Sequence, residues 1–82
     1  MRKYIYDVQE CFDLMGGDPR TFPIKLFDSL RGAKKYIKEL NDDMAKQKLK
    51  LWKVELETNS LIRYKSKSCP YHILIMRRKL NG

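Results

Sequence analysis

Residues that could support covalent chemistry or cross-linking are scarce in this sequence. Its 82 residues include two cysteines, one histidine, four glycines and three prolines. Cys11 and Cys69 lie far apart and form neither a Cys-x-x-Cys pair nor part of a dense disulfide framework, which favours a reducing cytoplasm over secretion. The spacing of the two cysteines does not decide whether they form a single disulfide bridge. The low cysteine content therefore predicts a cytoplasmic protein whose fold does not depend on a disulfide network.

Long apolar runs are also lacking. No stretch approaches the roughly 20 apolar residues of a membrane-spanning helix. Asp7 interrupts the amino-terminal region before any apolar run reaches the length of a signal peptide. We expect neither a membrane partner nor a targeting segment.

The groups needed for catalysis or metal binding are few and isolated. His72 is the only histidine, and no nucleophile motif accompanies it, so we expect a partly packed strand residue with one ring nitrogen hydrogen-bonded. The run Gly16-Gly17-Asp18 lacks the Gly-Lys-Ser/Thr ending of a phosphate loop and favours a plain turn. The acid pairs 42–43 and 55/57 have no third oxygen ligand nearby in the sequence. We predict no enzyme activity and no cofactor.

The first half of the chain alternates between strand and helix patterns. Apolar residues at positions 4, 6, 8, 12 and 14 predict a half-buried strand over 4–14, and glycine and proline predict a loop over 15–23. A short, edge-like strand follows at 24–27. Asp28 and Ser29 are both good N-cap residues, and an apolar stripe predicts an amphipathic helix that ends between 44 and 47. Gly32 in its first turn indicates a close approach to the sheet or to a partner. The stripe consists of Leu30, Ala33, Ile37, Leu40 and Met44.

The second half of the chain shows only strand and turn patterns. Trp52 alternates in step with Val54 and Leu56, which predicts a strand with Trp52 in the core. Turn residues at 58–60 and an extended pattern over 61–67 complete a hairpin. The apolar run 71–76 predicts a strand buried on both faces near the middle of the sheet. The sequence thus predicts a single basic α+β domain over residues 1–82, ordered ββαβββ, with one amphipathic helix on a mainly antiparallel sheet of four or five strands.

Positive charge is in large excess. The chain has 18 Lys and Arg against 10 Asp and Glu, a net charge of +8, and no acid follows Glu57. Such an excess favours polyanions and acidic protein surfaces as partners. The helix places its bases in its first half and its acids in its second, which the helix dipole disfavours. Arg63, Lys65 and Lys67 would form a row of cations about 6.5–7 Å apart on one strand face, close to the spacing of successive phosphates.

Strand tyrosines could add stacking surfaces for unpaired bases on the sheet face that the helix leaves open, although core packing is their commoner use. These tyrosines are Tyr4, Tyr6, Tyr64 and Tyr71.

Charge and the lack of catalytic motifs lead to three hypotheses. The first is a nucleic-acid-binding accessory protein that contacts the DNA or RNA backbone without reading bases. The alternative is a protein–protein interaction module, such as a phage-encoded inhibitor of a host or defence protein, that docks on an acidic protein surface through the open sheet face or a strand edge, alone or as a homodimer. The third is an enzyme assembled from distant strands, with His72 beside a carboxylate in a pocket. The predicted phosphate contacts are Arg31, Lys34, Lys35, Lys38, Arg63, Lys65, Lys67, Arg77 and Arg78.

Overall fold

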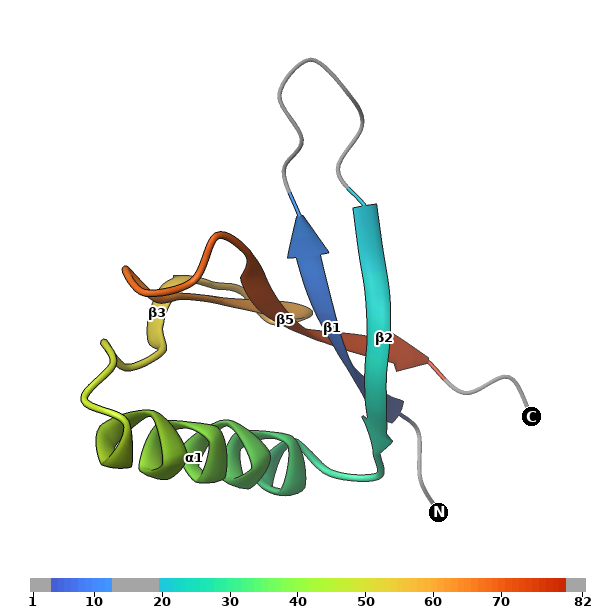
Figure 1. Ribbon diagram of the computed structural model, residues 1–82. Coiled ribbons are helices and arrows are strands. Elements are labelled where there is room, and N and C mark those ends of the chain that lie inside the picture. Colours follow the sequence, from blue (N-terminus) through green and yellow to red (C-terminus); the bar gives the residue numbers. More distant parts are fainter. Residues whose placement is uncertain (1–3, 13–19, 80–82) are drawn as a thin grey trace.

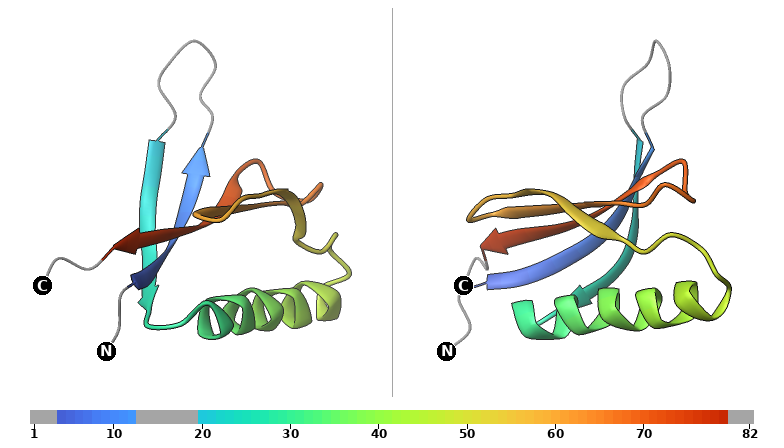
Figure 2. Two further views of the ribbon diagram at one scale, coloured as in Figure 1. Left: turned by 180° about the vertical axis from the view of Figure 1, so that it is seen from behind. Right: turned by 90° about the vertical axis from the view of Figure 1, so that its left-hand side faces the viewer.

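The structure, a computed structural model, describes residues 4–12 and 20–79 and contains one helix and five strands among them (Figure 1). The strands form one antiparallel sheet in the order β2-β1-β5-β4-β3. The helix α1 lies against one face of this sheet, and the other face stays open (Figure 2). The α+β prediction is confirmed, with five strands. In chain order the elements are β1 (Tyr4–Phe12), β2 (Arg20–Phe27), α1 (Leu30–Lys46), β3 (Lys53–Glu57), β4 (Leu61–Lys65) and β5 (His72–Lys79).

The core fills the space between α1 and the sheet. Ala33 and Ile37, from the predicted apolar stripe, are buried and pack in one cluster with side chains from β1, β4 and β5. Val8 and Ile75 are the largest fully buried side chains. Removing such a side chain from water stabilises the fold by about 1.5–3 kcal/mol. Trp52 is 5% exposed and belongs to the same cluster, as its alternation predicted.

Strand β5 is the centre of the sheet. Ile73 and Ile75 face α1, while Leu74 lies on the open face and is still only 9% exposed. Neighbouring strands β1 and β4 pair with β5 on its two sides. The continuous apolar run therefore gives a strand buried on both faces, as expected.

The start of α1 follows from its capping residue. The Ser29 hydroxyl accepts a hydrogen bond from the Gly32 N–H at 3.0 Å, so Ser29 is the N-cap. A Cβ atom added to Gly32 would lie 3.2 Å from Ser29 Oγ and 3.3 Å from a ring carbon of Phe27. Gly32 therefore lies where the helix closely approaches the end of β2, as the place of this glycine in the sequence indicated. The helix ends at Lys46, inside the predicted range.

Several strand boundaries differ from the sequence-based expectation, and β5 in particular runs over His72–Lys79, not over 71–76. Strand β2 begins at Arg20, not at Ile24, and runs through Pro23. A proline is tolerated there because β2 is an edge strand, which needs no hydrogen bonds on its outer side. Strand β4 ends at Lys65, not at Lys67. The predicted turn at Gly16-Gly17-Asp18 and the end of the first predicted strand at 13–14 lie outside the described residues.

The two cysteines are not joined by a disulfide. Cys69 packs against the core on the helix side of the sheet, whereas Cys11 follows Asp7 and Gln9 in the alternation of β1 and lies on the open side. The sheet separates them.

Candidate anion-binding surface

The predicted basic residues do not form one surface. Arg31, Lys34, Lys35 and Lys38 belong to α1. This helix lies on one side of the sheet (Figure 2). Arg63, Lys65 and Arg78 alternate with core residues of β4 and β5 and therefore lie on the open side. Arg77 points the other way, with its guanidinium 4.4 Å from the centre of the Tyr4 ring.

Three of the predicted cations are paired with acids. Arg78 Nε lies 2.8 Å from the buried carboxylate of Asp7, which also accepts a hydrogen bond from Gln9 at 2.7 Å. The pair lowers the net charge that Arg78 offers to a ligand, while the Arg78 side chain stays 52% exposed. The pairs Arg63–Glu55 at 3.5 Å and Lys34–Glu57 at 3.9 Å are more exposed and individually weak.

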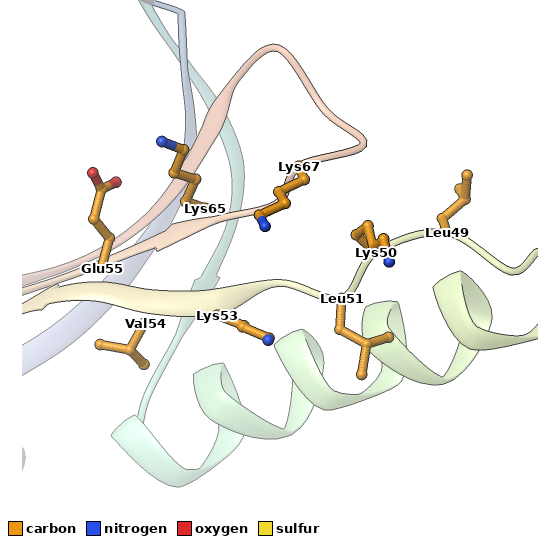
Figure 3. Close-up of a pocket in the computed structure, with 8 residues that line it drawn as sticks. All are labelled: Leu49, Lys50, Leu51, Lys53, Val54, Glu55, Lys65 and Lys67. Carbon is orange, nitrogen blue, oxygen red and sulfur yellow. The ribbon is translucent and has the colours of Figure 1, made fainter.

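Four lysines instead gather around one surface hollow. The hollow has a volume of about 560 Å³ and lies where the connector after α1 and the turn after β4 meet the first residues of β3 (Figure 3). Lys65 and Glu55 point to the open side of the sheet, while Leu51 and Val54 point toward α1. We call this site the lysine hollow. Its lining consists of Leu49, Lys50, Leu51, Lys53, Val54, Glu55, Lys65 and Lys67.

Two serines hold the walls of the lysine hollow together. The Ser66 hydroxyl donates to the carbonyl oxygen of Lys50 at 2.7 Å, and the Lys50 N–H donates to Ser68 Oγ at 2.9 Å. Ser66 Oγ also accepts from the Ser68 N–H at 3.1 Å. Ser66 is only 3% exposed, because the connector covers it. These bonds bend the chain after Lys65, so Lys67 leaves the strand, and the predicted three-residue cation row on β4 is replaced by lysines from several segments.

A second anchor fixes the connector to the helix. The Trp52 N–H donates to Asn41 Oδ1 at 2.7 Å, and Asn41 Nδ2 donates to the Trp52 carbonyl at 3.1 Å. The buried Trp52 side chain holds the same point in the core. The residues on either side of Trp52, Leu51 and Lys53, are thereby presented at the surface.

The lysine hollow keeps its positive charge. Lys53 and Lys65 are direct cross-strand partners, an arrangement of like charges that costs about 0.2–1 kcal/mol. Among residues 4–12 and 20–79, none of the ion pairs engages Lys50, Lys53, Lys65 or Lys67. The acid on the rim, Glu55, is directed to His72 Nε2 at 3.0 Å and to Arg63. The hollow can therefore attract an anion.

The sequence pointed to half of these lysines. Lys65 and Lys67 were predicted contacts, while Lys50 and Lys53 were missed. The missed signal is the alternation of lysine and leucine between the helix and the next strand, KLKLWK at positions 48–53. An amphipathic connector with exposed leucines and lysines is unusual for a simple link between two elements, since loops are mostly polar.

The predicted stacking tyrosines are mostly part of the core. Tyr64 is 7% exposed and Tyr6 and Tyr71 pack against the core cluster, so these three face α1 and not the open side. Burial raises the pKa of the Tyr64 hydroxyl, and the nearby carboxylate of Glu57 raises it further. Stacking on unpaired bases by these side chains would require opening the core.

His72 lies beside a carboxylate, the feature that an enzyme would need. Its partner Glu55 lines the lysine hollow, but His72 itself does not. Glu55 is also shared with Arg63, and the contact ties β3 to β5 across β4. The geometry fits a structural contact on the open sheet face.

No cluster of His, Cys, Asp and Glu within the described ranges has a geometry that could hold a metal ion. In the same part of the chain, no helix is both long and apolar enough to cross a membrane. Comparisons of the chain with protein-family models, curated proteins and solved structures found no match.

Proposed function

We propose that this chain is a non-catalytic accessory protein that binds the phosphate backbone of nucleic acids in the lysine hollow. The observation that carries the proposal is the grouping of four lysines from four segments around one hollow, without acid partners among the described residues. Lysine ammonium groups act as point charges for phosphate, and each contact releases a counterion. The expected binding depends on salt and not on sequence.

Several features support backbone binding over base recognition. The strand tyrosines are used in the core, and Trp52 is buried. The lining of the hollow contains no aromatic side chain and no Asn or Gln that could pair with a base edge. We therefore propose similar affinities for DNA and RNA.

The cations of α1 have a secondary role in this proposal. Arg31, Lys35 and Lys38 are exposed and add to the positive potential of the molecule. A long-range field of this kind speeds up encounters with polyanions without requiring direct contact. We place the protein in the cytoplasm, a location that the unbridged cysteines support.

The test is binding of a fluorescein-labelled oligonucleotide, measured by anisotropy across a salt series. Four phosphate contacts predict a slope of log K against log salt of about −3 to −4. The double variant Lys50→Gln/Lys67→Gln should lose about half of this slope and bind more weakly. The matched control Lys35→Gln/Lys46→Gln removes the same charge from α1 and should keep most of the slope. Equal losses in the two double variants would show that net charge alone is responsible and would remove the lysine hollow as the site.

A further inference from the structure

A second recess lies between α1 and the free end of the sheet. It has a volume of about 340 Å³ and meets the lysine hollow at Val54. Its helix wall carries Lys34 and Lys38, and Val54 and Glu57 of β3 form the opposite wall. Ile37, Ile62 and Tyr64 are also part of the lining and belong to the core. We call this recess the α1–β3 groove.

Strand β3 borders the groove and is the edge of the sheet. The strand order leaves one side of β3 without a neighbour, and all five of its residues are exposed. Val54 is 53% exposed on the helix side, where its partner is Tyr64, and Leu56 is 39% exposed on the open side, where its partner is Arg63. Such an edge offers main-chain donors and acceptors to an added strand, and its alternate side chains can select that strand.

We propose that the edge of β3 and the α1–β3 groove bind an extended segment of a partner protein in which acidic and apolar side chains alternate. Side chains on one face of the added strand would enter the groove. These would be its apolar side chains, which would cover Val54, while its acidic side chains would lie on the opposite face and meet Lys53 and Lys65 on the open side of the sheet. The neighbouring Glu57 is already 3.9 Å from Lys34, so it opposes an acidic ligand less than an isolated carboxylate would.

Charge favours an acidic partner over a second copy of this chain. Each copy carries a net charge of +8, so two β3 edges would approach against mutual repulsion. A short acidic segment meets no such repulsion. This proposal does not depend on nucleic-acid binding, because it uses the backbone of β3 and the wall of α1.

The test uses a capped, fluorescein-labelled octapeptide of alternating Asp and Val. Anisotropy should report binding, and NMR should show slowed amide exchange in β3 together with shifts at Val54 and Lys38. The same peptide with N-methyl groups on alternate residues cannot form the ladder and should bind about tenfold more weakly or worse. A Lys–Val octapeptide should not bind.

Variants separate this site from the lysine hollow. Val54→Lys and Lys53→Glu should each weaken peptide binding by about tenfold, while Lys50→Gln/Lys67→Gln should change it little. Val54 and Lys53 are both exposed, so these variants should fold, and circular dichroism checks this. Equal binding of the N-methylated peptide would overturn the strand-addition proposal. Self-association in light scattering without peptide binding would overturn it in favour of a second copy.

Discussion

Asn41 links the helix to the strand region through a single side chain. Its amide satisfies both backbone groups of Trp52, at 2.7 and 3.1 Å. Asn41→Ala leaves a partly buried N–H and carbonyl without partners, so we expect the free energy of unfolding to fall by about 1–3 kcal/mol. Urea denaturation measures this loss. The control Gln47→Ala removes an exposed hydrogen bond to Asp43 and should change stability by less than about 0.5 kcal/mol. A loss in the control as large as that of Asn41→Ala would contradict the assigned role.

Because of Tyr64, we expect the free energy of unfolding to change with pH in the alkaline range. Burial and Glu57 raise the pKa of its hydroxyl above the ordinary value of about 10. The unfolded chain then loses this proton at a lower pH than the folded chain does. The contribution of Tyr64 is fully present below about pH 10 and is lost as the pH rises through the folded-state pKa. Urea unfolding on both sides of pH 10 should show a smaller decline for Tyr64→Phe than for the original chain. Tyr36→Phe, which keeps Tyr64, should retain the steeper decline, and a parallel decline in all three proteins would refute the assignment.

At the scale of the element, α1 carries charges that oppose its dipole at one end. No acid lies in its first turn, where Arg31 is exposed, while Lys46 occupies the last turn. Acids near the start and bases near the end of a helix each stabilise it by about 0.3–1 kcal/mol. Arg31→Glu should therefore raise the free energy of unfolding by roughly this amount, and Lys46→Glu should lower it. Denaturation at low ionic strength tests both signs, and changes of the same sign in the two variants would show that the dipole is not the cause.

The β3–β4 hairpin was predicted from the sequence, but the pairing of lysines within it was not. The alternation and the turn residues at 58–60 are local signals, and the hairpin forms as expected. Thr58 closes the turn, since its hydroxyl accepts hydrogen bonds from the N–H groups of Ser60 and Leu61. The register that places Lys53 opposite Lys65 depends on the shift between Val54 and Leu56. Local periodicity does not specify such a shift.

The molecule as a whole is thin and open. Its radius of gyration is 13.4 Å, compared with about 12 Å expected for a compact domain of this length. A single helix covers only part of one sheet face, and the end of β1 and the start of β2 extend beyond the covered part (Figure 1). Large apolar side chains consequently stay exposed, including Phe22 at 49% and Leu26 at 59%. The open shape leaves free the surfaces on which both binding proposals depend.

A net charge of +8 on such a small molecule should make its stability depend on salt. Self-repulsion destabilises the compact state, and salt screens it. We expect the free energy of unfolding to rise by on the order of 1 kcal/mol between low and moderate sodium chloride, of which the Lys53–Lys65 pair supplies a part. Thermal or urea unfolding at several salt concentrations measures the effect, and Lys53→Gln/Lys65→Gln should reduce it. Stability that falls with added salt would indicate that attractive ion pairs dominate.

The sequence by itself determined the elements, their order and most of the buried positions, but not the faces of Val54 and Leu56, which the register shift in β3 separates. The apolar stripe of α1, the buried Trp52 and the central position of β5 all follow from side-chain periods, which are local properties of the backbone. Arginines and lysines could be named as candidates, but their pairing could not: Arg78 is held by Asp7, which is 71 residues away in the chain.

Only the tertiary structure decided which cations share a surface. Lys50 and Lys67 line one hollow because Ser66 and Ser68 join the connector to the turn after β4, whereas Arg77 packs on the Tyr4 ring. Contacts between distant segments depend on hydrogen-bond register and on packing around the core. A linear pattern of charge contains neither of these, which is why the candidate site emerged only from the folded chain.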